Sequence, residues 1–350
     1  MKHYEVIVHQ VFDETPAARS FQLAIPAELS EKFSYSPGQY LTLQIPYRNG
    51  SLYRCYSLCS SPHNGELPSI LVKRVRKGHA SNWLCDNIQA GGTLSVLPPT
   101  GNFVPRSLDT NLLLIAAGSG ISPIFSILKS ALHAGKADVY LIYANHDADS
   151  VIFAGQIENL QQQYASRFSV THWLDGQRGL PSAESIASLA TNWTHADCFL
   201  CGPQPFMDTT LIALQTLGVH ADRVHQETFA TSFEAAGSDG VAEEDDGREK
   251  AVVEVNMGNR IEQLACGYSE YLLNAILRAG IKAPNSCRTG NCASCKCKLE
   301  EGEVVLDSNS VLDEDDIKAG WIVSCRAKPQ SGFVRLAISE QDISEQFDSF

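Results

Sequence analysis

Short runs of alternating apolar and polar residues fill the first hundred positions of the chain. These runs lie at residues 4–11, 40–46, 69–75 and 92–98, and Gly and Pro interrupt them at close intervals. A period of two places one face of a strand in a core and the other toward solvent. Residues 1–107 are therefore predicted to form an antiparallel β-barrel or sandwich.

The pattern changes near residue 108 to continuous apolar runs that are followed by helical segments. Residues 112–117 read LLLIAA and precede the helical segment 122–135, and residues 138–145 are again apolar and precede an acidic helix. This alternation of apolar strand and helix is typical of a parallel sheet. An α/β parallel-sheet domain is predicted for residues 108–230.

An acidic stretch separates these two units from the rest of the chain. Residues 231–250 contain seven acidic and two basic residues and hardly an apolar side chain after Phe233, so a linker is predicted there. Residues 251–350 then combine a strand pattern, a helical pattern, a cysteine-rich loop and two late strands near Trp321 and Phe333. This order predicts a compact α+β domain.

The composition is acidic and otherwise ordinary for a globular protein. The 350 residues include 27 Lys and Arg and 40 Asp and Glu, a net charge of 27 − 40 = −13. This charge disfavours nonspecific attraction to nucleic acid or anionic lipid and favours a partner with a basic face. The longest apolar run, Leu112–Ala117, falls far short of the ~20 residues that span a bilayer. No secretory signal pattern opens the chain, so the cytoplasm is the expected compartment.

Eleven cysteines are present, and stable disulfides are not expected in that compartment. Three of the cysteines form a tight group, with four residues between Cys287 and Cys292 and two between Cys292 and Cys295, and Cys325 follows at a distance. This is the plant-type 2Fe–2S spacing, in which four thiolates hold two irons. The alternative is a structural zinc site, but such sites pair two short cysteine hairpins and the second hairpin is missing. Cys297 and Cys266 are interpreted as buried small residues.

Residues 251–345 resemble a plant-type ferredoxin domain, through CRTGNCASC and through VLDEDDIKAGWIVSC, which leads to Cys325. The resemblance implies a ferredoxin-like β-grasp fold with Cys287, Cys292, Cys295 and Cys325 as the metal ligands.

Two segments of the N-terminal unit resemble the flavin motifs of the ferredoxin reductase superfamily, RCYSLCSSP and KRVRKGHASNWL. The resemblance implies that Arg54 pairs with flavin phosphates, Tyr56 lies along the isoalloxazine and Ser57 hydrogen-bonds near its reactive nitrogen. It also implies FAD rather than FMN, because GHASN resembles a diphosphate-binding turn. The predicted flavin-binding residues are Arg54, Tyr56, Ser57, Lys73, Val75, Gly78, Ala80 and Ser81.

The apolar strand of the second unit runs into AGSGISP, which suits a nicotinamide dinucleotide. Gly118 and Gly120 lie in the turn, with Ser122 predicted at the helix cap and Pro123 at the first helical position. The third glycine of the full dinucleotide fingerprint is absent, so this motif alone is weak. A second strand ends in CGP, which places Cys201, Gly202 and Pro203 at the carboxyl edge of the sheet.

By resemblance, Cys201 lies beside the nicotinamide, although a buried strand cysteine such as Cys198 remains the alternative. NADH is preferred to NADPH because ANHDADSVIF has acids and no Lys or Arg for an extra phosphate, with His146 where relatives often carry Arg. HQETF resembles a segment whose aromatic residue covers the flavin, so Phe229 is a candidate gate, beside Glu227. A core phenylalanine is the alternative.

The order of these units resembles the reductase components of bacterial multicomponent oxygenases. Within that family, VKRVRKGHASNWLCDN and AGSGISP carry a likeness to the reductases of steroid and acyl-thioester systems. The resemblance implies an NADH-dependent enzyme that passes electrons through FAD and a 2Fe–2S cluster to a partner oxygenase, with Ser57, Cys201 and Phe229 at the reacting groups. A Rieske-type partner is expected. The alternatives are a di-iron oxygenase as partner, and a noncatalytic 2Fe–2S carrier or redox sensor.

Overall fold

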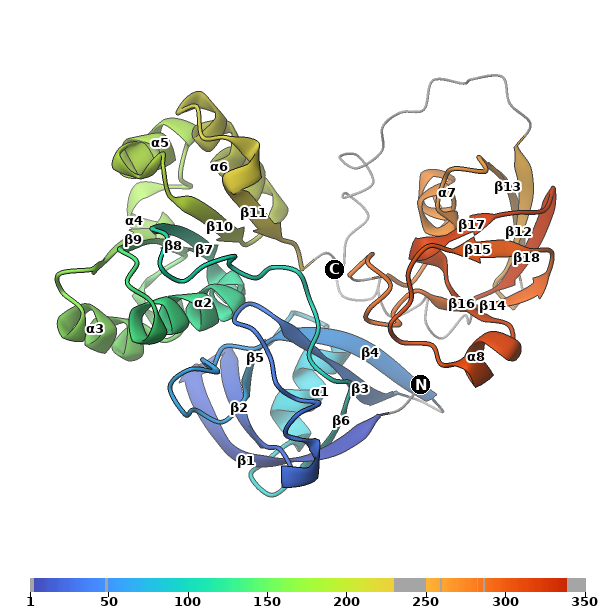
Figure 1. Cartoon of the computed structure of the whole chain (residues 1–350), viewed down its shortest axis with the longest axis horizontal. Helices are drawn as coiled ribbons and strands as arrows, with labels where there is room; N and C mark the ends of the chain where they lie inside the picture. The colour runs from blue at the N-terminus through green and yellow to red at the C-terminus, as the bar shows by residue number, and fades with distance from the viewer. Residues whose placement is uncertain are drawn as a thin grey trace.

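The structure is a computed structural model that describes residues 3–47, 50–229, 250–258, 260–281, 283–285 and 287–338. Three structural units occupy three successive stretches of the chain, and Figure 1 shows them as a blue barrel, a green and yellow α/β unit and an orange and red unit. This is the predicted fold class. The predicted acidic linker, residues 231–250, lies outside the described residues except for Lys250.

The N-terminal unit is a six-stranded antiparallel barrel. Its strand order is β4-β3-β6-β1-β2-β5, and an isolated bridge between Leu58 and Ile70 joins the end of β4 to β5. Val6 and Val8 are buried whereas Ile7 between them is 53% exposed, as alternation along a strand requires. The elements are β1 (Tyr4–Thr15), β2 (Ala18–Ala24), η1 (Ala27–Leu29), β3 (Tyr40–Tyr47), β4 (Gly50–Ser57), β5 (Ser69–Lys73), α1 (His79–Asn87) and β6 (Thr93–Val96).

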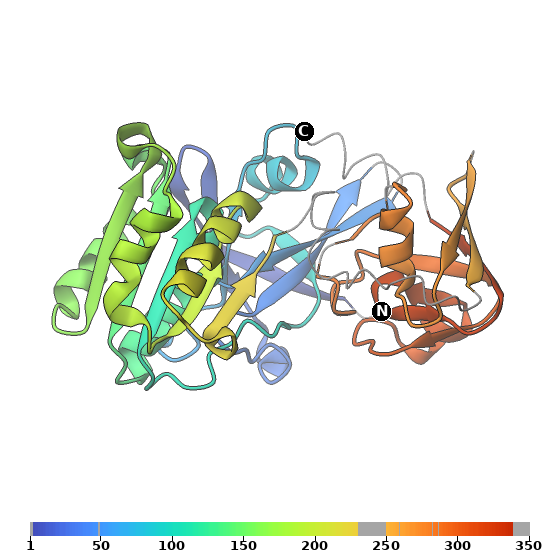
Figure 2. The same cartoon turned by 90° about the horizontal axis from the view of Figure 1, so that it is seen from above.

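The central unit is a parallel sheet in the order β11-β10-β7-β8-β9. All six residues of β7 are buried because helices cover both faces: Leu112 packs in the core that contains Ile124 of α2, and Leu113 packs with Met207 of α6. Figure 2 shows helices on both sides of this sheet. The elements are β7 (Leu112–Ala117), η2 (Gly118–Gly120), α2 (Ile121–Ala134), β8 (Val139–Asn145), η3 (Ala148–Ser150), α3 (Ala154–Gln163), β9 (Phe168–Leu174), α4 (Asp175–Arg178), α5 (Ala183–Ala190), η4 (Thr191–Trp193), β10 (Asp197–Cys201), α6 (Gln204–Thr216), η5 (Ala221–Arg223) and β11 (Val224–Glu227).

The C-terminal unit has a mixed sheet in the order β13-β12-β18-β14-β16 and a two-stranded sheet of β15 and β17. Strands β12 and β18 are parallel, and α7 supplies buried apolar residues to the core. Cys266 and Cys297 are buried in that core. The elements are β12 (Ala251–Asn256), β13 (Ile261–Cys266), α7 (Leu272–Arg278), β14 (Lys296–Glu301), β15 (Val304–Leu306), α8 (Glu314–Lys318), β16 (Trp321–Val323), η7 (Ser324–Arg326), β17 (Ala327–Pro329) and β18 (Phe333–Ala337).

Helix α2 joins the central unit to the barrel through a stripe of buried serines. The serines recur at every fourth residue, so they share one face of the helix. Buried hydroxyls need partners, and each of these finds one on the chain that ends β4 or follows it. The pairs are Ser122 Oγ to Ser57 O at 2.8 Å, Ser126 Oγ to Ser60 O at 2.6 Å and Ser130 Oγ with Ser61 Oγ at 2.9 Å.

Candidate functional site

Strand β4 carries the three residues of the first flavin motif. Because successive side chains of a strand point to opposite faces, Arg54 and Tyr56 share one face and Ser57 lies on the other. Arg54 is half-buried, and its Nη1 donates to the carbonyl oxygen of Tyr53 at 2.9 Å. Burial raises the pKa of the Tyr56 phenol, so this ring stays neutral. A cation and an aromatic ring on one face suit a flavin and its phosphates.

The second flavin motif forms a turn before α1. The hydroxyl of Ser81 accepts from the amide of Val75 at 3.1 Å, and Asn82 Nδ2 donates to the carbonyl oxygen of Gly78 at 2.6 Å. Helix α1 begins at His79, so the buried residues Ala80 and Ser81 lie in its first turn. The side chains of Ser81 and Asn82 therefore shape the turn, and backbone amides at the helix start are the groups that can face a phosphate.

Lys73, predicted for the flavin, extends from the end of β5 to the glycine turn of the central unit. A Cβ atom added to Gly118 would lie 3.4 Å from the Lys73 ammonium nitrogen. Gly118 has φ +52°, and its carbonyl oxygen accepts from the Tyr143 hydroxyl at 3.2 Å. The structure thus places a cation of the barrel beside the turn predicted for the nicotinamide dinucleotide, where it can serve an anionic group.

The predicted nicotinamide residues meet at the carboxyl edge of the parallel sheet, where open α/β sheets bind ligands. A Cβ on Gly120 would lie 2.1 Å from the carbonyl oxygen of Cys201, and one on Gly202 would lie 3.0 Å from Cβ of Ala117. Glycine is required at position 120 for this close approach, whereas a Cβ at position 202 would press on its neighbours. Pro203 follows directly and is the N-cap of α6.

The predicted helix cap at Ser122 is wrong. Helix α2 begins at Ile121, its N-cap is Gly120, and no side chain caps it. Ser122 and Pro123 therefore lie inside the first turn. The Ser122 hydroxyl bonds to the carbonyl oxygen of Ser57 in the barrel, so a contact between units replaces the local cap.

Cys201 is fully buried at the end of β10 and lies next to Glu227 of β11 in the parallel register. Burial and the nearby carboxylate raise the pKa of its thiol, so Cys201 is held neutral. Burial and the proximity of Cys287 raise the pKa of Glu227 to about 7. Phe229, two residues later, is 41% exposed and is therefore not a core residue. A buried carboxyl of the central unit therefore lies near the cysteine loop, a proximity that the sequence did not indicate.

The four predicted cluster cysteines lie together as two pairs. The thiols of Cys287 and Cys292 interact, as do those of Cys295 and Cys325. The neighbouring thiol of Cys292, together with burial, raises the pKa of Cys287. Buried thiolates therefore need metal cations to be stable here.

No three His, Cys, Asp or Glu side chains of the described ranges form a group that could hold a metal ion. Two thiol pairs fit a cluster of two irons, because each iron can take one pair.

The backbone of the cysteine loop is shaped to surround these thiols. Arg288 and Ala293 have φ of +54° and +58°, a conformation that is costly for residues with a side chain. Gly290 also has positive φ, and a Cβ there would lie 2.8 Å from the carbonyl oxygen of Ser308. The curvature turns amides toward sulfur, and the amide of Thr289 donates to the Cys287 sulfur at 3.4 Å. Such bonds stabilise anionic sulfur.

The cysteine loop lies directly against the barrel. Ser294 Oγ donates to the carbonyl oxygen of Tyr53, the neighbour of Arg54, at 3.3 Å. Leu97 of the barrel belongs to the same hydrophobic cluster as the C-terminal core. Tyr40 and Cys55 of the barrel face the cluster cysteines. No local sequence signal marks Tyr40 or Cys55, since both belong to ordinary alternating strands.

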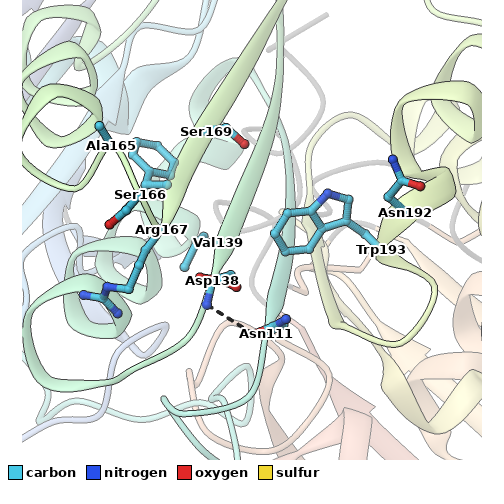
Figure 3. Close-up of a pocket in the computed structure, with 10 residues that line it drawn as sticks. Asn111, Asp138, Val139, Ala165, Ser166, Arg167, Ser169, Asn192 and Trp193 are labelled. Carbon is cyan, nitrogen blue, oxygen red and sulfur yellow. Dashed lines mark hydrogen bonds between the residues drawn. The ribbon is translucent and has the colours of Figure 1, made fainter.

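A pocket of about 380 Å³ lies at the opposite, amino-terminal edge of the parallel sheet (Figure 3). Asn111, Asp138 and Phe168 line it where β7, β8 and β9 begin, and the Asp138 amide donates to Asn111 Oδ1 at 3.1 Å. The guanidinium of Arg167 at this pocket donates hydrogen bonds to three backbone carbonyl oxygens near the end of α2. The pocket contains none of the predicted site residues and lies at the edge where such sheets do not bind their ligands.

Family models match the three units in order. Residues 6–104 match an oxidoreductase FAD-binding domain, residues 114–211 an oxidoreductase NAD-binding domain and residues 257–330 a 2Fe-2S iron-sulfur cluster binding domain. These matches confirm FAD, a nicotinamide dinucleotide and a 2Fe–2S cluster as the cofactors. The fold and the site together define an iron–sulfur flavoprotein oxidoreductase.

Comparison with similar proteins identifies the family within this class of oxidoreductase. The chain is 45% identical to the 3-ketosteroid-9-alpha-monooxygenase ferredoxin reductase component of Rhodococcus rhodochrous, over 94% of this chain and 95% of that protein. It is 32% identical to a component of the 1,2-phenylacetyl-CoA epoxidase of Escherichia coli strain K12, over 93% of this chain and 95% of that protein. The chain therefore belongs to this family of ferredoxin reductase components. These are the steroid and acyl-thioester systems that the motifs predict, so that resemblance is confirmed.

A solved structure shares the whole architecture. Phthalate dioxygenase reductase, which transfers electrons from pyridine nucleotides to a 2Fe–2S cluster, aligns with a TM-score of 0.59 and 22% identity, over 96% of this chain and 98% of that chain. This likeness supports the fold. No helix in the described part of the chain is long and apolar enough to cross a bilayer.

Proposed function

We propose that this protein is the NADH-dependent reductase component of a Rieske-type oxygenase system that hydroxylates a 3-ketosteroid at the 9α position. The identity of 45% to a reductase of that system supports the steroid assignment, against 32% for the component of the phenylacetyl-CoA epoxidase. The oxygenase is the electron acceptor, and the steroid itself does not bind to this chain.

The proposal rests on one observation: the barrel, the nicotinamide unit and the cysteine loop lie against one another. Ser122 of the nicotinamide unit bonds to Ser57 of the barrel, and Glu227 of the nicotinamide unit lies near Cys287 of the cysteine loop. Electron transfer requires short distances between donor and acceptor groups. These contacts between units support the proposal that the three cofactor sites lie close together in one chain.

Each cofactor supplies chemistry that side chains lack: NADH donates a hydride, FAD converts an electron pair into single electrons, and the cluster carries them singly. We assign Arg54, Lys73 and the Gly78–Ser81 turn to the FAD phosphates. Tyr56 and Ser57 orient the flavin ring.

The glycine turn at Gly118 and Gly120, with Ser122, Gly202 and Pro203, receives the dinucleotide. Cys201 and Phe229 border the nicotinamide and the flavin. Cys287, Cys292, Cys295 and Cys325 ligate the irons.

NADH is the proposed donor because the region that follows β8 is acidic. Asp147 caps η3 at the end of that strand, and the Ser150 hydroxyl and amide hold the pKa of its carboxyl below the usual range. An anionic Asp147 repels a 2′-phosphate and can accept from a 2′-hydroxyl. A kcat/KM for NADPH equal to that for NADH would contradict this preference.

The domain limits that we propose are 1–107 for FAD, 108–230 for NAD, 231–250 for the linker and 251–350 for the cluster. We also propose a basic docking face on the oxygenase, because residues 231–350 carry ten of the thirteen net negative charges, −5 in the linker and −5 after it. We propose the cytoplasm as the compartment, because eleven cysteines and a predicted thiolate site suit a reducing environment.

A visible spectrum of the purified protein and a reconstituted assay test this function. We expect a flavin band over the broad cluster absorption, bleached by NADH, and electron delivery to a 3-ketosteroid hydroxylase but not to a phenylacetyl-CoA epoxidase. Protein without flavin would indicate a carrier or a sensor. Delivery to the epoxidase alone would indicate a di-iron partner.

A further inference from the structure

The hydroxyl of Tyr40 is a buried polar group without a hydrogen-bond partner among the described residues. Tyr40 is only 4% exposed, and its backbone is held by Thr100, whose carbonyl oxygen accepts from the Tyr40 amide at 2.9 Å. Gly101 keeps space for the ring, since a Cβ there would lie 3.1 Å from two ring carbons of Tyr40. Buried hydroxyls are almost always paired, so this arrangement needs an explanation.

The Tyr40 ring points from the flavin side of the protein toward the cysteine loop. Tyr40 is the cross-strand partner of Ser57, the residue assigned to the flavin ring, and its hydroxyl is within reach of the Cys287 thiol. One side chain therefore bridges the two cofactor sites.

Cys55 occupies a matching position two residues before Ser57. It pairs with Thr42 across β3 and β4, and Thr42 Oγ1 lies 3.6 Å from the Cys55 sulfur. Thr42 is fully buried, and the Cys55 thiol is within hydrogen-bonding reach of Cys292. Since alternate residues of a strand share a face, Cys55 and Ser57 lie on the face that carries Tyr40 and Thr42.

The contact between the barrel and the cysteine loop is direct on this face. Ser294 Oγ bonds to the Tyr53 carbonyl oxygen at 3.3 Å, and Tyr53 lies two residues before Cys55 on β4. Two donors of the barrel, a phenol and a thiol, therefore face one thiol pair, Cys287 and Cys292. Cys295 and Cys325 pair with each other instead.

We propose that Tyr40 and Cys55 are positioning residues that hydrogen-bond the sulfur atoms at Cys287 and Cys292 and so raise the reduction potential of the cluster. A donor to sulfur stabilises the extra negative charge of the reduced state. Because the donors belong to the flavin unit, the potential is raised while the two units are in contact, which favours electron transfer from the flavin side. This inference rests on the proposed 2Fe–2S site.

The test is a redox titration of the full-length holoprotein, with the cluster followed by electron paramagnetic resonance. Tyr40→Phe and Cys55→Ala should each lower the midpoint potential. We expect a roughly tenfold change in the reduction equilibrium, which is about 59 mV for one electron. Cys55→Ser, which keeps a donor, should retain a potential near that of the wild type. Iron and flavin content are measured on the same samples.

Two matched variants control for the loss of a buried phenol or thiol in the barrel. Tyr35→Phe removes a hydroxyl that bonds Ser60 at 2.6 Å, and Cys85→Ala removes a buried thiol on α1. Both should leave the potential unchanged. The inference is overturned if Tyr40→Phe and Cys55→Ala keep the wild-type potential at full iron content. If Tyr40→Phe loses iron, the difference in midpoint potential between Cys55→Ala and Cys55→Ser tests the inference instead. A wild-type protein without a cluster signal would instead refute the proposed function.

Discussion

Gly120 and Cys201 approach so closely that a Cβ atom on Gly120 would lie 2.1 Å from the Cys201 carbonyl oxygen. The glycine turn after β7 is therefore packed against the end of β10. This contact holds together the two strand ends at which the dinucleotide is expected to bind.

Replacing Gly120 with Ala should separate the two strand ends, because the obstructing atom is backbone and cannot move aside. We expect at least a tenfold rise in KM for NADH and a lower thermal midpoint. Gly155→Ala is the control, since nothing lies within 4 Å of a Cβ there and the site is helical. That variant should be neutral or more stable by up to about 1 kcal/mol. Equal behaviour of both variants would contradict the role of this contact.

Ser126→Ala tests the serine stripe of α2 without touching a predicted cofactor residue. The variant removes a buried hydrogen bond of 2.6 Å and leaves the Ser60 carbonyl oxygen unsatisfied. The expected loss is about 1–3 kcal/mol of unfolding free energy. Ser166→Ala, at an exposed position, should change stability by less than about 0.5 kcal/mol. Chemical denaturation of the holoproteins measures both.

Cys292→Ser tests the cluster assignment. We expect loss of iron and of electron delivery to the oxygenase, while reduction of a dye by NADH persists, since the flavin and nicotinamide sites lie in other units. The matched control Cys297→Ala removes a thiol that is equally buried but is not predicted to ligate iron. It should keep the cluster. Coupled oxygenation by Cys292→Ser would refute the electron route.

The raised pKa of Glu227 predicts that the stability of the protein depends on pH. Its pKa is raised by burial and by Cys287 to about 7, above the ordinary 4.5. The folded state therefore binds the proton of Glu227 more tightly than the unfolded state does. The resulting contribution to the free energy of unfolding is fully present below pH 4.5 and is lost as the pH rises through about 7. The full loss is about 3 kcal/mol.

Glu227→Gln mimics the protonated acid and should remove this loss. The thermal midpoints of both holoproteins are measured at pH 5.5 and 8.0. The midpoint of Glu227→Gln should rise relative to that of the wild type as the pH rises. Glu184→Gln on the exposed part of α5 should follow the wild type. A Glu227→Gln midpoint that falls as steeply as that of the wild type would contradict the assignment.

Charge steering predicts sensitivity to salt. If the acidic C-terminal part docks on a basic face, the rate of oxygenase reduction should fall several-fold between 50 and 500 mM NaCl, roughly the range in which surface charges become screened. Reduction of a dye by NADH should change much less. A flat salt profile for the oxygenase would rule out steering.

The sequence predicted the grouping of the candidate ligands and misplaced one helix start. The cysteine spacing predicts four ligands, and the structure brings their thiols together as two pairs, Cys287 with Cys292 and Cys295 with Cys325. The cap at Ser122 failed because its hydroxyl bonds to Ser57, which lies 65 positions away. A capping rule considers only neighbours in the chain and cannot anticipate such a competing partner.

Local patterns in the chain predict the fold class of each unit, the order of the three units and the spacing of the candidate ligands. These depend on alternation, apolar runs and motifs that act over about ten residues. Long-range packing, by contrast, brings Tyr40 and Cys55 to the cluster cysteines, Lys73 to Gly118 and Glu227 to Cys287. Those encounters follow from the register of β3 against β4 and from the packing of one unit on another, which no local pattern of residues encodes.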